Sequence, residues 1–132
     1  MIKVIKSLEP EEILIIHARI IDETGGSHGV RDLNQIDSMI ERPKLQFSGR
    51  DLYPTVFNKA ATYFESCAYH HSFIDGNKRT AVALASRFLY LNGFELKISN
   101  NKLEEFVLSA ATKKYNLTEI AAWIKRYSVP KN

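Results

Sequence analysis

The sequence has little cysteine and no long hydrophobic run. Its single cysteine, Cys67, cannot form a disulfide framework and cannot supply a cysteine-based zinc site. No apolar stretch approaches the roughly 18 residues that a membrane-spanning helix needs. The first residues, Met-Ile-Lys-Val-Ile-Lys, do not have the layout of a secretory signal peptide. We therefore expect a cytoplasmic protein without a membrane partner.

The excess of one sign of charge is also small. The 132 residues carry 18 Lys and Arg against 15 Asp and Glu, a formal net charge of +3. This excess suits an acidic partner or a nucleotide, but it is too small to indicate direct binding of nucleic acid. Hydrophobic residues make up 45% of the chain, enough for one core. The length predicts a single domain over residues 1–132.

Apolar residues recur at helical spacing and predict about six helices. Residues typical of helix starts are Pro10, Asp32, Pro54, Asn77, Asn100 and Asn116. Two of these starts resemble capping boxes, in which Gln35 would answer Asp32 and Glu119 would answer Asn116. Gly25, Pro43 and Gly93 mark helix ends, and Pro130 marks the end of the last helix. The sequence therefore predicts a mainly α domain.

Residues 80–91 are apolar almost all round, which is typical of a buried central helix. After Gly93, residues 94–98 alternate apolar and polar side chains and predict a short strand. Residues 2–6 are its candidate partner. The expected fold is six or so helices packed around one buried helix, with at most a tiny two-stranded sheet.

A polar loop leads into the central helix and ends in Gly76, Asn77, Lys78 and Arg79. The start of a helix carries unpaired N–H groups and a partial positive charge, so two cations there are unfavourable without an anion. A phosphate group is the simplest anion to expect. Gly76 permits close backbone approach, Asn77 can cap the helix and bond a phosphate oxygen, and Arg79 offers a planar fork of donors.

Three further residues of the loop have chemical or structural roles. His71 is the candidate general base, because histidine titrates near neutral pH. Asp75 can hold Mg²⁺ beside a polyphosphate, or it can cap the helix. Phe73 is expected to anchor the loop in the core. Elsewhere, His17 on the first helix and Cys67 are expected to be structural, His17 bonded to backbone and Cys67 buried.

The loop pattern is His71-x-Phe73-x-Asp75-Gly76-Asn77-Lys78-Arg79. It resembles the motif of the Fic/Doc (Fido) superfamily, H-x-F-x-[DE]-G-N-G-R-x-x-R. Lys78 replaces the second glycine and Val82 replaces the last arginine, and both departures are similar to the Doc (death-on-curing) branch. That branch supplies the toxin of type II toxin–antitoxin pairs.

The resemblance implies an activity and two protein partners. A Doc toxin transfers the γ-phosphate of ATP to a hydroxyl of a protein target, elongation factor Tu in the characterised branch. His71 would be the base, Asp75 would hold Mg²⁺, and residues 76–79 would bind phosphates. The self-inhibitory motif [ST]-x-x-x-E-[GN] of many Fic proteins is absent from the sequence. A separate Phd-like antitoxin, with its C-terminal segment in a groove near the site, would then restrain the toxin.

Residues 44–53 form an apolar segment that we expect to be irregular, with Leu45, Phe47 and Arg50. This segment either covers the core or forms the flap that docks the protein target in Fic-like proteins.

Three other functions are alternatives to this interpretation, and the third of them fails. Fic-type adenylyl transfer (AMPylation) needs the same residues and differs in which phosphorus faces the target hydroxyl. A non-enzymatic basic binding module is compatible with the charge, but no helix clusters base-reading residues. A metal hydrolase built on His70, His71 and Asp75 fails because adjacent side chains rarely converge on one ion.

Overall fold

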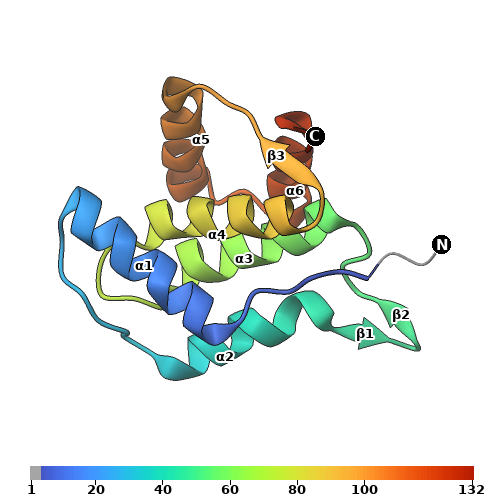
Figure 1. The fold of residues 1–132 in the computed structure, drawn as a ribbon, viewed down its shortest axis with the longest axis horizontal. Coiled ribbons are helices and arrows are strands. Elements are labelled where there is room, and N and C mark those ends of the chain that lie inside the picture. Colours follow the sequence, from blue (N-terminus) through green and yellow to red (C-terminus); the bar gives the residue numbers. More distant parts are fainter. Residues whose placement is uncertain (1–3) are drawn as a thin grey trace.

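The computed structural model describes residues 4–132 (Figure 1). These residues form six α-helices, a short 3-10 helix and two small two-stranded sheets. The elements are α1 (Pro10–Thr24), α2 (Leu33–Glu41), η1 (Arg42–Lys44), β1 (Gln46–Phe47), β2 (Arg50–Asp51), α3 (Val56–His70), α4 (Asn77–Leu91), β3 (Phe94–Leu96), α5 (Asn100–Lys113), α6 (Leu117–Arg126) and β4 (Ser128–Pro130). The predicted mainly α class is confirmed. None of the helices in this part of the chain is long and apolar enough to cross a membrane.

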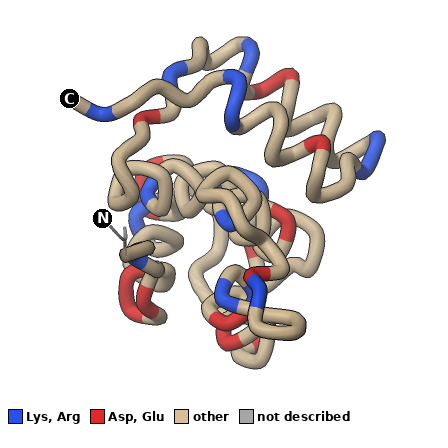
Figure 2. The backbone as a smooth tube through the Cα atoms, turned by 90° about the vertical axis from the view of Figure 1, so that its right-hand side faces the viewer, with Lys and Arg blue, Asp and Glu red and all other residues tan. Residues whose placement is uncertain are grey.

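The helices pack in three groups. α3 and α4 pack against each other in the middle of the molecule, with α1 and α2 on one side and α5 and α6 on the other (Figure 1). Lys and Arg alternate with Asp and Glu along the tube in Figure 2, so charge of both signs is dispersed over the described chain. The loop between α3 and α4 joins these two central helices.

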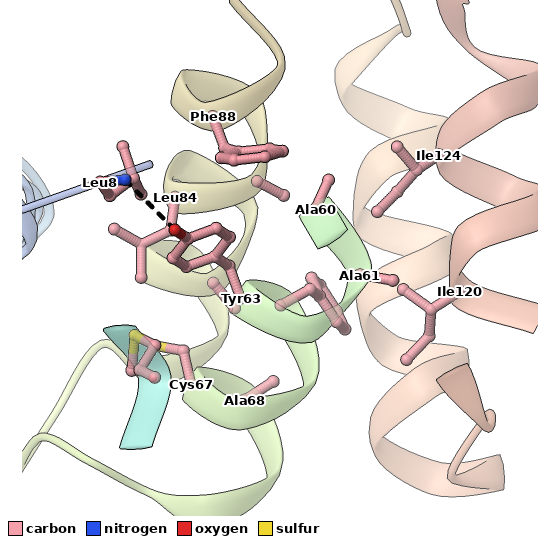
Figure 3. Packing of buried hydrophobic residues seen from close by; sticks show 14 of the residues in the cluster. Leu8, Ala60, Ala61, Tyr63, Cys67, Ala68, Leu84, Phe88, Ile120 and Ile124 are labelled. Atoms are coloured by element: carbon pink, nitrogen blue, oxygen red, sulfur yellow. Dashed lines mark hydrogen bonds between the residues drawn. The ribbon is translucent and has the colours of Figure 1, made fainter. Parts of the chain in front are cut away.

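Small residues on α3 let the neighbouring helices approach closely. Ala60 and Ala61 face Ile120 and Ile124 of α6 across the core (Figure 3). On the other side of α3, the hydroxyl of Tyr63 accepts a hydrogen bond of 3.2 Å from the backbone N–H of Leu8, drawn as the dashed line in Figure 3. Contact between small and branched side chains fills such a core without voids. The core thus holds α3 from both sides.

The centre of the fold is shared by two helices. α4 buries six residues, from Thr80 to Leu89, but Val82 and Ala83 are only half-buried. α3 is buried more completely, and its buried side chains include the polar Lys59 and Thr62. Hydropathy pointed to α4 because Ser86 and Arg87 are the strongly polar residues between Thr80 and Leu91.

Only one of the two predicted capping boxes is present. Asn116 and Glu119 exchange side-chain-to-backbone hydrogen bonds at the start of α6, as predicted. At the start of α2, the Asp32 side chain instead accepts from the N–H of Asn34 at 3.0 Å. The Asp32 carboxylate thus bonds a backbone N–H two residues ahead, and the Gln35 side chain does not bond back to Asp32. The expected role of Gln35 was therefore wrong.

The predicted pairing of residues 2–6 with residues 94–98 was wrong. β3 pairs with β4, whose last residue is Pro130, so this proline ends a strand and α6 ends earlier, at Arg126. Residues 4–6 form no strand, and residues 1–3 lie outside the described part of the chain. The side-chain amide of Asn92 bonds both backbone groups of Lys6 and occupies the position where strand pairing was expected.

The segment expected to be irregular, residues 44–53, contains a β-hairpin. Ser48 and Gly49 both have positive φ, 51° and 77°, which is the geometry of a tight two-residue turn between β1 and β2. Phe47 is 76% exposed and Leu45 is 46% exposed, and Arg50 is also exposed. The hairpin therefore does not bury its apolar residues in the core.

Candidate functional site

The candidate site is the loop that joins α3 to α4. α3 ends at His70, and the next residue, His71, takes a left-handed conformation with φ 49° and ψ 57°. Gly76, the residue before α4, is also left-handed, with φ 75°. A Cβ added at Gly76 would lie 2.9 Å from Cδ1 of Ile21, so a side chain does not fit there. These two turns bring the exposed His71 imidazole to the start of α4.

Phe73 anchors the loop in the protein interior, as predicted. It is fully buried, and its ring stacks on the imidazole of His17 with centroids 3.8 Å apart and planes 6° apart. Its backbone bridges to Val30 in the segment that follows α1. The loop is therefore fixed to two segments that precede it by more than 40 residues in the chain.

Asn77 stabilises the loop rather than capping α4. Its side-chain oxygen accepts from the N–H of Phe73, and its side-chain amide donates to the carbonyl of Phe73, both at 2.9 Å. Gly76 occupies the capping position, so the expected capping role of Asn77 was wrong. The positive φ of Gly76 turns the chain so that Asn77 is the first helical residue, and its amide faces back over the loop.

Asp75 is held at two points. One carboxylate oxygen, Oδ2, accepts a hydrogen bond of 2.8 Å from the backbone N–H of Ser27. Its backbone carbonyl lies 2.8 Å from Nε2 of His17. No side chain caps α4, which excludes the helix-capping role of Asp75 as an alternative.

The residues present fit a magnesium ion. Within residues 4–132, no hydrogen-bond donor reaches Oδ1 of Asp75, and the side chain is exposed. No group of three or more His, Cys, Asp or Glu in this range could hold a metal. Mg²⁺ commonly uses one or two carboxylates together with substrate phosphates and water. A carboxylate oxygen without a donor among the described residues, beside the basic start of α4, suits that requirement.

The predicted catalytic, metal-binding and phosphate-binding residues line one depression of about 290 Å³, whereas Phe73 is buried and does not line it. Its lining residues are His71, Ile74, Asp75, Gly76, Asn77, Lys78 and Arg79. Lys78 and Arg79 are exposed, and neither forms an ion pair among the described residues. Their charges and the start of α4 make the depression attractive to an anion.

A groove of about 670 Å³ lies next to this depression, between α1, α4 and α5. Lys78 and Arg79 line both. Val82, at the position of the missing arginine of the motif, faces the groove, and so do Leu103 and the exposed Leu108 of α5. The groove is thus apolar along its length and basic at the end that meets the site.

Two residues of the site were not expected from the sequence. His17 was correctly predicted to be bonded to backbone, but nothing in its helix indicated that the backbone partner is Asp75. Ser27 lies in a glycine-rich loop between Gly25 and Gly29, and this local flexibility is the only signal of its role.

Comparisons with known proteins identify the family of the chain. Residues 7–89, more than half of the chain, match the Fic/DOC family. A relative named Toxin Doc, from Mycolicibacterium smegmatis, is 39% identical over 100 residues, which cover 74% of this chain and 77% of the relative. A second, Protein kinase doc from Escherichia phage P1, is 29% identical over 121 residues, or 92% of this chain and 94% of the relative. The chain therefore belongs to the Doc branch of the Fic/Doc family.

Proposed function

We propose that the protein is a toxin that transfers the γ-phosphate of ATP to a threonine or serine hydroxyl of a protein target in the cytoplasm. The observation that carries the proposal is the convergence of His71, Asp75 and the basic start of α4 on one depression. The name of the phage P1 relative, a protein kinase, supports the choice of reaction. Elongation factor Tu is the proposed target, by resemblance to the Doc branch.

The residues divide the chemistry among them. The N–H groups at the start of α4, with Lys78 and Arg79, bind the phosphates of ATP. Asp75 holds magnesium, which neutralises charge on the phosphate oxygens when bound. His71 accepts the proton of the target hydroxyl as that oxygen bonds to the γ-phosphorus, and the bond to the bridging oxygen breaks, releasing ADP. Catalysis of this kind depends mainly on positioning and on charge neutralisation.

The β1–β2 hairpin is the proposed docking flap for the target. Phe47 and Leu45 are exposed apolar side chains on a segment fixed to the protein at its base. Exposed apolar residues on an ordered hairpin are typical of a binding surface. The flap role is therefore favoured over the alternative that this segment covers the core.

The groove between α1, α4 and α5 is the proposed site of a Phd-like antitoxin. An amphipathic segment with apolar residues and an acidic end would match the apolar walls and Lys78 with Arg79. Because both basic residues also line the depression, a segment bound there would compete with ATP for them.

Two variants test the proposal. Arg79→Ala should weaken binding of Mg·ATP about tenfold in calorimetric titration, since a charge-assisted hydrogen bond is lost. Arg87→Ala, which removes an exposed arginine paired with Glu12 on the far part of α4, is the matched control. His71→Ala should fold, bind ATP and fail to arrest bacterial growth. Growth arrest equal to that of the unaltered protein would show that His71 is not the base.

A further inference from the structure

We propose that His17, on α1, is a positioning residue that sets the direction of the Asp75 carboxylate. The proposal rests on the proposed role of Asp75 in holding magnesium. His17 lies outside the motif and is 58 residues from Asp75 in the chain, but it contacts the loop at two points. One contact is the hydrogen bond to the Asp75 carbonyl, and the other is the stack on Phe73.

The hydrogen bond has a defined direction. A carbonyl oxygen can only accept, so Nε2 of His17 carries the proton and donates it to Asp75 at 2.8 Å. This bond fixes the peptide plane that follows Asp75. Stacking against the fully buried Phe73 fixes the imidazole plane, so the direction of the donor is fixed as well.

The carboxylate is then oriented from the other side. The N–H of Ser27 donates to Oδ2 at 2.8 Å, and a Cβ added at Gly26 would lie 3.2 Å from Cβ of Asp75. With the carbonyl held by His17 and Oδ2 held by Ser27, the side chain has little freedom about its bonds. Oδ1 is the oxygen left for a ligand.

The histidine contributes more than packing to this arrangement. His17 is 4% exposed, so an apolar residue would fill its place in the core without a polar group to satisfy. The Asp75 carbonyl, in turn, is the acceptor of a part-buried hydrogen bond and would lose its donor. What the histidine adds is a donor in a fixed direction on a flat ring.

Two variants separate the donor from the ring. His17→Phe keeps a flat ring and removes the donor, whereas His17→Gln keeps a donor and loses the stack. Ile13→Ala weakens α1 at a fully buried position away from the loop and is the control for general destabilisation. All three are compared with the unaltered protein.

The first measurement is amide hydrogen exchange of Ser27, whose N–H reports the place of the carboxylate, in the absence of ATP and metal. His17→Phe should speed this exchange about tenfold, the effect of losing one hydrogen bond's stabilisation. In His17→Gln the Ser27 exchange rate should stay closer to that of the unaltered protein, and in Ile13→Ala the rate should equal that of the unaltered protein. Equal exchange in His17→Phe and the unaltered protein would overturn the proposal.

The second measurement is calorimetric titration of ATP at a series of magnesium concentrations and in chelator. His17→Phe should need about tenfold more magnesium for half of the gain in ATP affinity, with binding in chelator unchanged. An unchanged magnesium dependence would overturn the proposal even if the exchange rate changed. Failure of the unaltered protein to bind Mg·ATP would instead contradict the proposed function, and the exchange result would still decide whether His17 orients Asp75.

Discussion

Nζ of Lys59 lies 3.2 Å from Oδ2 of Asp51, and this ion pair ties the β1–β2 hairpin to α3. The Lys59 ammonium also donates to the carbonyl of Pro43 at 3.0 Å, and the residue is 6% exposed. A buried ammonium that loses its carboxylate is strongly unfavourable. At the base of the same hairpin, Arg42 bonds Tyr53 and Glu65. The proposed flap is therefore attached to α3 through charged residues.

Asp51→Asn should loosen the hairpin without unfolding the helices. At pH 7, the N–H of Leu52, which bonds the Leu45 carbonyl at 2.9 Å, should exchange faster in this variant. Asp37→Asn, which changes an exposed carboxylate on α2, should have no such effect. If both variants exchange at the rate of the unaltered protein, Lys59 and Asp51 do not hold the hairpin.

Acid should have the same effect as Asp51→Asn. Hydrogen bonds from Gln46 and Lys59, with the charge of Lys59, hold the pKa of Asp51 below its ordinary value of 3.8. A lowered pKa means that the attachment is fully present above pH 3.8 and is lost as the pH falls through the pKa of the folded state. The amide shifts of hairpin residues should therefore titrate with a midpoint below 3.8, and a midpoint above that value would contradict the ion pair.

Phe47→Ser should impair target modification much more than ATP binding. The side chain is 76% exposed, so the free energy of unfolding should change by less than about 0.5 kcal/mol. Loss of an apolar docking residue should slow modification about tenfold or more. Leu33→Ser, at a 69% exposed position on α2, is the matched control and should retain full activity. Equal rates for both variants would remove the docking role from the hairpin.

Tyr63→Phe should lower the free energy of unfolding by about 1–3 kcal/mol, measured by urea denaturation. The hydroxyl is the partner of the buried N–H of Leu8, which the variant leaves unpaired. Burial raises the pKa of Tyr63 to about 12, in keeping with a hydroxyl removed from water. Tyr90→Phe, at a 44% exposed position, should cost less than about 0.5 kcal/mol. Equal costs for the two variants would contradict this account of the core.

Cys67 should resist alkylation in the native protein. Burial raises the pKa of its thiol to about 12 from an ordinary value of 9.0, so the reactive thiolate is scarce. The neutral thiol favours the folded state, so its contribution to stability is constant below pH 9.0 and is lost as the pH rises through about 12. Iodoacetamide should label Cys67 only after denaturant unfolds the chain, and rapid native labelling at pH 8 would show that the thiol is accessible.

Some features that depend on neighbouring residues were predictable from the sequence, but the capping box of Asp32 with Gln35 and the capping role of Asn77 were not. The capping box of Asn116 and Glu119 needs two side chains three residues apart, and the motif from His71 to Arg79 is one continuous stretch of the chain. Burial of Phe73 followed because it is the aromatic residue in a polar loop. The signal for each prediction lies within one short stretch of sequence, although the contacts of Phe73 are with the distant His17 and Val30.

The features that depend on distant residues were not predictable. The alternation in residues 94–98 predicted a strand but not its partner, which is chosen by where α6 ends, near Ser128. The sequence predicted a structural His17 bonded to backbone, but not that α1 crosses the loop at Asp75. Lys59 illustrates a further difficulty, because a lysine within a helix is normally exposed and here finds its partner on a hairpin.

The most direct test of the central claim is to incubate the protein and a bacterial lysate with ATP labelled at either the α or the γ phosphorus. Lys78 stands where the Fic motif has glycine, and Val82 lines the groove without the charge of the last arginine. We therefore expect the γ-phosphate to face His71, and label from the γ position alone to reach a protein target. His71→Ala should abolish that transfer. Label that reaches protein only from the α position would contradict the kinase account and identify the protein as an adenylyltransferase.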